Sequence, residues 1–294
     1  MNRFTISELE QFSGIKSHTI RIWEQRYNAL KPTRSDGNTR YYDNTQLVRL
    51  LNIVSLMGSE NKVSAICSMP DEMLVKMVKE KFRNHLSGDS TNEYYISQLI
   101  TAGISFDEAH FEKIFSNCVL RLGMRNTYVK IIYPLLNRIG IMWVAGTISP
   151  AYEHFITNFI KQKLYSAIDS LPPAKSSGKS WLLFLPENEF HEIGLLFSHY
   201  LIRNENNKVI YLGANVPLET MMEAMQQTVP ENLLFFLVHH DTPENAQALI
   251  NSLKKYPGNI KIYFTGNEKL ISKLKPGKEF IWIRSAEDFE KHLS

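Results

Sequence analysis

The stretch WLLFLPENEFHEIGLLFSHYLI, residues 181–202, decides how the C-terminal part of the chain folds. Its first six residues are apolar, which predicts a buried strand, and its last residues repeat apolar side chains at helical spacing. Between strand and helix lies ENEFHEIG, residues 187–194, in which His191 is flanked by glutamates. The question is whether His191 binds a ligand or is an ordinary polar residue of a turn.

Four further strand–helix pairs follow the first one. The predicted strands are residues 181–186, 208–213, 232–240, 261–266 and 279–285, and the helices between and after them are 191–204, 217–227, 242–255, 268–274 and 286–293. Such alternation predicts a Rossmann-like (flavodoxin-like) domain with a parallel five-stranded sheet and helices on both faces. Ligands bind such sheets at the carboxyl ends of their strands, which is where His191 falls.

The first 75 residues predict a different domain. Thr5 and Glu8 suit a capping box for a helix over 5–14, and Ser17 is placed to cap a second helix over 17–27. Two short helices joined by a turn containing Gly14 are typical of a helix-turn-helix. Residues 31–42 combine turn residues with β-prone ones and predict a hairpin, or wing. Between Lys16 and Arg49 there are seven basic and three acidic residues, a local excess that favours a nucleic-acid partner.

Residues 76–171 are helical throughout by periodicity. Helices are predicted over 90–103, 105–123, 128–146 and 149–171, and their short connections favour a four-helix bundle. Residues 172–180 have the composition of a linker. The resulting domains are 1–75, 76–171 and 181–294, so the fold class is multidomain, α and α/β.

Composition narrows the class of protein. The chain has 294 residues with 44% hydrophobic and 21% charged residues, which is typical of globular domains. Only two cysteines occur, Cys67 and Cys118, so neither a disulfide framework nor a zinc site is indicated. The N-terminus lacks a signal-peptide pattern, and no apolar segment reaches the roughly 18 residues of a membrane span. We therefore expect a cytoplasmic protein.

The N-terminal residues resemble the MerR family of bacterial transcription regulators over about 3–70. The match is carried in order and spacing by Thr19, Arg21, Trp23, Glu24, Arg34, Gly37, Arg40 and Tyr41. The resemblance implies binding to double-stranded operator DNA, with the second helix in the major groove, where Arg and Gln pair with base edges. Arg34 and Arg40 on the wing would hold phosphates or enter the minor groove. The expected DNA-binding residues are His18, Thr19, Arg21, Gln25, Arg26, Arg34, Arg40 and Tyr41. The alternative is that these are solvated faces of an unrelated helical domain, against which the wing argues.

The remainder, about 80–294, resembles the cobalamin-binding module of methionine-synthase type. That module's Asp-x-His-x-x-Gly motif is matched here by Glu189, His191 and Gly194, with Glu in place of Asp. The resemblance implies that His191 is the lower ligand of cobalt. A carboxylate two residues earlier can bond the other ring nitrogen and fix its tautomer, and the glycine permits close approach of the cofactor.

A MerR head joined to this module resembles the light-responsive, adenosylcobalamin-dependent repressors of the CarH/LitR group. Their Trp-x9-Glu-His motif is matched by Trp143, Glu153 and His154. The resemblance implies that these three residues cover the upper face of the corrin. Alone, Trp143 would be interpreted as a core aromatic, and Glu153 as a residue that suits a helix N-terminus.

The chain departs from that group at three places. The third predicted strand ends in Leu237, Val238 and His239, where the module has a serine that contacts the nucleotide tail. The fourth ends in Thr265 and Gly266 in place of Gly-Gly, and Val144 replaces a histidine that captures cobalt after illumination. Val238, His239 and Gly266 are still expected at the cofactor, and His239 or His240 could replace the missing hydrogen bond.

Three hypotheses follow. The first is a homo-oligomeric regulator (dimer or tetramer), a repressor without enzyme activity, controlled by adenosylcobalamin and light. The second keeps the DNA-binding head but makes the C-terminal module a degenerate one, which oligomerises or senses a partner or another ligand. The third is a corrinoid enzyme subunit that carries methyl groups, against which the head argues.

Overall fold

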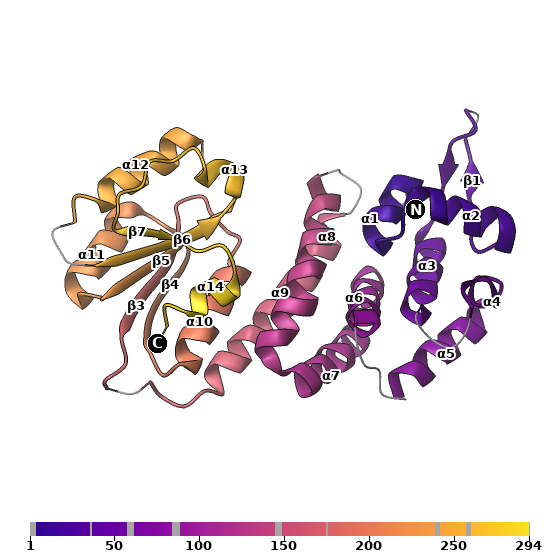
Figure 1. Cartoon of the computed structure of the whole chain (residues 1–294), viewed down its shortest axis with the longest axis horizontal. Coiled ribbons are helices and arrows are strands. Elements are labelled where there is room, and N and C mark those ends of the chain that lie inside the picture. The colour runs from indigo at the N-terminus through magenta and orange to yellow at the C-terminus, as the bar shows by residue number, and fades with distance from the viewer. Residues whose placement is uncertain are drawn as a thin grey trace. The chain divides into compact units, whose positions relative to one another are not determined.

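The computed structural model describes residues 4–35, 37–57, 62–83, 89–144, 149–174, 176–238, 242–256 and 260–293. Within these ranges the side chains of residues 79, 81–83, 89–91 and 141–144 are also outside the description. The chain forms two compact units, residues 1–157 and 158–294 (Figure 1). The predicted division of the first unit near residue 75 stays a prediction.

The first unit begins with the predicted helix-turn-helix and wing. Its elements are α1 (Ile6–Ser13), α2 (Ser17–Tyr27), β1 (Thr33–Arg34), β2 (Arg40–Tyr41), α3 (Asn44–Leu56), α4 (Val63–Cys67) and α5 (Asp71–Arg83). The capping box of Thr5 and Glu8 is present, and Gly14 ends α1 in the left-handed conformation with φ 71°. Strands β1 and β2 pair antiparallel, which confirms the hairpin.

The second helix does not begin as predicted. Ser17 is the first residue of α2 rather than its cap, and the preceding Lys16 makes no side-chain capping bond. The cap comes from α1: the Glu10 carboxylate accepts from the Ser17 N–H at 2.9 Å and from its hydroxyl at 2.7 Å. These bonds, the hydroxyl's first, lower the pKa of Glu10 to about 2. A long-range acceptor thus replaces the local cap that the sequence predicts.

The helical bundle follows in the same unit. It consists of α6 (Asp89–Ile104), α7 (Glu108–Thr127), the π-helix η1 (Tyr128–Ile132), α8 (Tyr133–Val144) and α9 (Pro150–Asp169), the last of which extends into the second unit. The expected break at Gly123 is a kink inside α7, with φ 74° and ψ 161°. The chain stays helical across it, because α7 leads directly into η1 and η1 into α8.

A polar centre connects the helix-turn-helix segment with the bundle. Helix α3 packs against α6, and the amide nitrogen of the buried Gln98 donates to Asn52 at 3.2 Å and to Ser55 at 2.9 Å. The amide oxygen of Gln98 lies 3.2 Å from the His110 ring. Buried polar groups with such partners fix one packing arrangement, so these contacts set the register between α3 and the bundle.

The second unit contains the predicted parallel sheet. Strands β3 (Ser180–Pro186), β4 (Lys208–Val216), β5 (Asn232–Leu237), β6 (Lys261–Gly266) and β7 (Phe280–Trp282) pair in the order β4-β3-β5-β6-β7. The intervening helices are α10 (Ile193–Asn204), α11 (Leu218–Thr228), α12 (Pro243–Leu253), α13 (Glu268–Ile271) and α14 (Ala286–Glu290).

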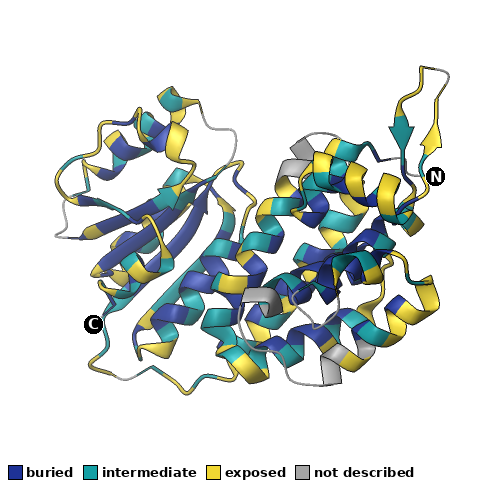
Figure 2. Cartoon of the chain, turned by 45° about the vertical axis from the view of Figure 1, so that its right-hand side comes forward, coloured by how far each residue is buried: buried dark blue, intermediate teal, exposed yellow. Residues whose placement is uncertain are grey.

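Alternating side chains of β3 serve the two faces of the sheet. Leu182 and Phe184 belong to the core formed with α11, α12 and α13, whereas the Trp181 ring meets Phe289 of α14 on the other face. Figures 1 and 2 show the helices on both sides and the buried sheet between them. The crossover from β3 leads to β4 on one side of it, and the crossover from β4 leads back past β3 to β5 on the other side. The switch point therefore falls between the carboxyl ends of β3 and β5.

Burial of His199 makes the stability of this unit depend on pH. The ring of His199 stacks on Tyr211 at 5.1 Å, and among the described atoms its Nδ1 has no hydrogen-bond partner. Burial, helped by the charge of Arg203, lowers the pKa of His199 from 6.5 to about 4. Between pH 6.5 and pH 4, His199 is mostly protonated in the unfolded chain and mostly neutral in the folded chain. The free energy of unfolding therefore falls as the pH falls from 6.5 toward 4.

We expect protonation of His199 in the unfolded chain to lower the free energy of unfolding by about 2 kcal/mol between pH 7 and pH 5. Replacing the ring, as in His199→Gln, should remove that part of the pH dependence. Urea unfolding of both proteins at the two pH values measures it. Equal losses for the two proteins would contradict the assignment.

Candidate functional site

The loop between β3 and α10 is fixed by its own backbone. Glu189 donates its N–H to Pro186 at 3.0 Å, and Asn188, at φ 65°, donates to the Asn215 side chain at 2.9 Å. The N–H of Asn215 in turn donates to the Glu189 carbonyl at 3.1 Å. The loop is therefore held against the end of β4 before any ligand is considered.

The carboxylate of Glu189 is the centre of the site. It is 3% exposed, and its Oε1 accepts from the backbone N–H groups of Phe190 and His191, each at 3.0 Å. Its Oε2 accepts from the N–H of Val238, just after β5, at 2.9 Å. A buried carboxylate needs such donors, because its desolvation is otherwise costly. One side chain thus joins the carboxyl ends of β3 and β5 across the switch point.

The same carboxylate orients His191. The Nδ1 of His191 lies 2.6 Å from Glu189 Oε1, and the imidazole side chain is 52% exposed. A carboxylate at Nδ1 favours the tautomer with its proton there, which places the lone pair on Nε2. This confirms the contact expected from the Glu-x-His spacing and makes Nε2 the atom suited to a metal.

Two glycines shape the surroundings. A Cβ on Gly194, in the first turn of α10, would come within 2.7 Å of the Phe236 ring. Gly266, at φ 139°, pairs with Leu237 in the β5–β6 register, and a Cβ there would meet the Leu237 carbonyl oxygen at 2.0 Å. Glycine is therefore required at Gly266 by the backbone itself.

The described residues contain no cluster of three or more His, Cys, Asp or Glu side chains that could hold a metal ion. A metal ion at His191 would bind Nε2, since Nδ1 lies 2.6 Å from the Glu189 carboxylate. A cofactor that brings its own metal fits such a single nitrogen donor.

Phe190 is a neighbour that sequence analysis missed. It lies between Glu189 and His191 and is 61% exposed. The sequence feature that could have indicated Phe190 is an aromatic residue between the glutamates of this loop. An exposed aromatic beside the imidazole offers apolar contact area to a flat ligand.

The other expected cofactor residues are distributed as follows. Glu153 and His154 lie in the first turns of α9 in the first unit, with His154 Nδ1 3.2 Å from Glu153 Oε2 and the His154 side chain 71% exposed. Trp143 and Val144 end α8, but their side chains lie outside the described residues, as do His239 and His240.

The expected DNA-binding residues lie on α2 and the wing. Ile20 and Trp23 of α2 are buried, and the exposed members of the predicted set are His18, Arg21, Gln25, Arg26 and Arg34. Thr19 is half-buried and lies 3.3 Å from the His18 ring. The polar face of α2 is thus presented to solvent as a groove-binding helix requires.

Arg40 and Tyr41 are half-buried, and Arg40 has a partner within the protein. Its Nε donates to Glu24 at 2.9 Å, and the Tyr42 hydroxyl donates to the same carboxylate at 2.8 Å. The bond to Glu24 raises the pKa of Arg40. These contacts join the wing to α2 and fix their relative orientation.

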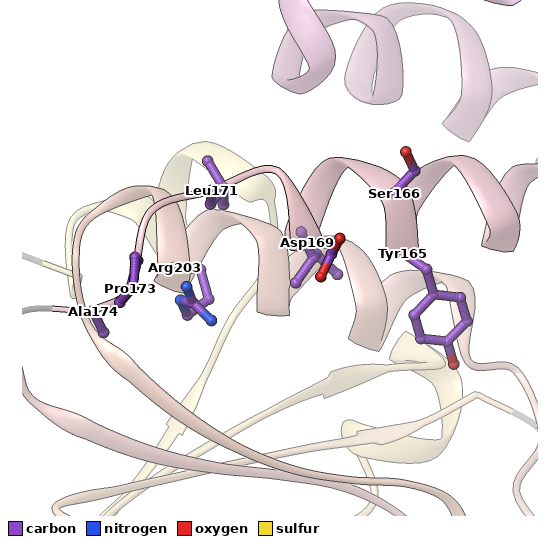
Figure 3. Close-up of a pocket in the computed structure, with 8 residues that line it drawn as sticks. Tyr165, Ser166, Asp169, Leu171, Pro173, Ala174 and Arg203 are labelled. Atoms are coloured by element: carbon purple, nitrogen blue, oxygen red, sulfur yellow. The ribbon is translucent and has the colours of Figure 1, made fainter.

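A cavity of about 890 Å³ lies beside the C-terminal half of α9 (Figure 3). None of the residues expected at the cofactor or DNA lines it. Its lining residues are Tyr165, Ser166, Ile168, Asp169, Leu171, Pro173, Ala174 and Arg203.

Comparisons with known proteins find relatives of the helix-turn-helix segment and of the helical bundle. Residues 4–66 match the MerR HTH family regulatory protein, and residues 95–167 match the B12 binding domain. The HTH-type transcriptional repressor CarH of Myxococcus xanthus is 22% identical over 90% of this chain and 88% of its own length. The repressor CarA of the same organism is 24% identical over 83% and 80%.

One solved structure is similar in fold over about two thirds of the chain. The monomethylamine corrinoid protein of Methanosarcina barkeri is similar with a TM-score of 0.52, at 15% identity, over 68% of this chain and 97% of that one. The chain thus joins a segment that matches the MerR model to one that matches the B12 binding domain, and a Rossmann-like sheet follows them. None of the described helices is long and apolar enough to cross a membrane.

We expect Glu189→Gln to lower the free energy of unfolding by about 2–3 kcal/mol, because the amide NH2 would face N–H donors in a buried position. Urea unfolding measures the change. The control is Glu187→Gln, an exposed charge in the same loop, which should stay within about 0.5 kcal/mol. Equal stability of the two variants would contradict the role assigned to the Glu189 carboxylate.

Proposed function

We propose that this protein is a DNA-binding transcriptional regulator, a repressor, whose DNA affinity is controlled by adenosylcobalamin bound to its C-terminal part. The observation that carries the proposal is the His191–Glu189 pair at the switch point of the sheet, in one chain with a MerR-type helix-turn-helix. Similarity to the repressors CarH and CarA over most of the chain supports the same assignment.

The cofactor part of the proposal assigns roles to this chain's residues. His191 would offer Nε2 to cobalt, while Glu189 holds the proton on Nδ1 and keeps the ring in place. Phe190 would contact the macrocycle, and Gly194 and Gly266 are assigned to the cofactor on their positions in the Glu-x-His-x-x-Gly motif and at the end of β6. Glu153 and His154 are assigned to the upper face on the Trp-x9-Glu-His spacing. Adenosylcobalamin, when bound there, would supply a light-sensitive cobalt–carbon bond.

The DNA part assigns base contacts to α2 and phosphate contacts to the wing. Arg21, Gln25 and Arg26 are exposed on α2, and Arg34 is exposed on β1. A monomer presents one such head, so a homo-oligomer with several heads gains avidity for a repeated operator. Cofactor control then requires that loading or loss of adenosylcobalamin changes the balance between assembly states. Similarity to CarH and CarA, which are transcriptional repressors, supports a regulator rather than an enzyme.

Operator affinity with and without the cofactor tests the proposal. An operator is first selected from random-sequence duplexes with the full-length protein. Its Kd is then measured without cofactor, with adenosylcobalamin in the dark, and after illumination. We expect the dark, loaded protein to differ from the other two states by about tenfold or more, which corresponds to a coupling of about 1.4 kcal/mol. His191→Ala should remove the difference. One Kd shared by all three states of the unaltered protein would contradict cofactor control.

We expect Arg21→Ala to weaken operator binding by about 5- to 100-fold through loss of a base-edge contact. Arg121, exposed on α7, offers a matched control: Arg121→Ala removes the same charge away from α2. Both are measured by titration of labelled operator at fixed salt. If the two variants weaken binding equally, α2 is not the recognition helix.

A further inference from the structure

Glu192, the residue after His191, lies at the centre of a second polar cluster. Its Oε1 accepts from the Tyr211 hydroxyl of β4 at 3.0 Å and from the Tyr165 hydroxyl of α9 at 3.3 Å. Its Oε2 lies 3.3 Å from the ammonium of Lys161, also of α9. The Glu192 side chain is 13% exposed and that of Lys161 is 28% exposed. The cluster therefore joins three elements of the second unit that are far apart in sequence.

The backbone ties Glu192 to the histidine loop. Its N–H donates to the Phe190 carbonyl at 2.8 Å, and its own carbonyl accepts from Leu196 N–H at 2.9 Å, so it is the N-cap residue of α10. Any displacement of Phe190 and His191 relative to the sheet must therefore displace Glu192 as well.

Strand β4 is adapted to receive this carboxylate. At Gly213 the strand adopts φ 81°, next to a register shift against β3, and a Cβ there would lie 3.5 Å from Glu192 Oε1. Burial, followed by the charge of Glu192, raises the pKa of Tyr211, and the same causes raise that of Tyr165. Both hydroxyls thus keep their protons and act as donors near neutral pH.

The other side of the cluster is α9. Lys161 and Tyr165 are four residues apart and share one face of the helix. In Figure 3 Tyr165 points from α9 toward the sheet, whereas Ser166 points the opposite way. The same helix begins at Pro150 and carries Glu153 and His154 in its first turns.

We propose that Glu192 is a positioning residue that transmits changes at His191 to helix α9. The inference rests on the proposed function, in which His191 binds cobalt. When the ligand loop shifts on binding, the Glu192 carboxylate shifts with it, and Lys161 and Tyr165 follow through the ion pair and the hydrogen bond that join them to this carboxylate. Helix α9 then carries the change toward the residues assigned to the upper face. Glu192 itself contacts neither cobalt nor DNA.

Backbone hydrogen exchange in α9 tests this. Exchange of peptides covering 158–169 is measured on the full-length protein, free and loaded with adenosylcobalamin in the dark, and loading is confirmed by the absorption spectrum after desalting. We expect loading to change exchange in these peptides about fivefold or more in the unaltered chain, in the range of allosteric couplings. The variant Glu192→Gln keeps a hydrogen-bond acceptor but loses the charge, and it should still bind the red cofactor. In this variant, loading should change the exchange of these peptides by less than about twofold.

Two further variants sharpen the result. Lys161→Met breaks the same ion pair from the α9 side and should reproduce the loss, whereas Glu187→Gln removes an exposed charge from the same loop and should behave as the unaltered chain. Loading without a change of exchange in the unaltered chain would overturn the inference and leave the proposed function standing. Loss of cobalamin binding in Glu192→Gln would overturn it too, since Glu192 would then be part of the binding site. Failure of the unaltered chain to load would overturn both.

Discussion

A single buried carboxylate, Glu189, connects the fold of the second unit with its chemistry. Three backbone N–H groups, from Phe190, His191 and Val238, converge on its two oxygens, and the imidazole Nδ1 of His191 lies 2.6 Å from one of them. The acceptor capacity of the carboxylate is thereby used in a place where unsatisfied charge would be costly. Because Val238 follows β5 and Glu189 follows β3, the bond between them closes the switch point that the strand order creates. The orientation of His191 is thus a consequence of the same contacts that hold the two strand ends together.

The substitution of Glu for Asp at this position is compatible with that geometry. The longer side chain reaches back to its own loop N–H groups and across to β5 at the same time. A ligand histidine held in this way is pre-organised, so less free energy is spent on ordering it when a metal binds. The neighbouring Glu192 uses the other side of the loop, toward β4 and α9. Glu189 therefore orients His191, and Glu192 connects the same loop to β4 and α9.

Much of this arrangement could be predicted from the sequence, and the limits have physical causes. Apolar runs such as 181–186 are short and alternate with helical segments, so their strand character and parallel pairing could be predicted from the order of the segments. The capping box at Thr5 is local and was predicted correctly, whereas the Ser17 prediction was wrong because Glu10, seven residues earlier, provides the cap through the turn. The Glu189–His191 contact follows from a two-residue spacing. The contacts of Glu192 with Tyr165 and Tyr211 join positions 27 and 19 residues away, and only the folded chain brings them together.

Control of DNA binding by cobalamin would require that His191 binds cobalt. The direct measurement is the absorption spectrum of the full-length protein mixed in the dark with adenosylcobalamin and desalted, beside His191→Ala treated in the same way. We predict that the unaltered protein retains the red cofactor and that His191→Ala loses it or shows the spectrum of a changed lower ligand. A colourless unaltered protein, or identical spectra of the two red proteins, would contradict the assignment.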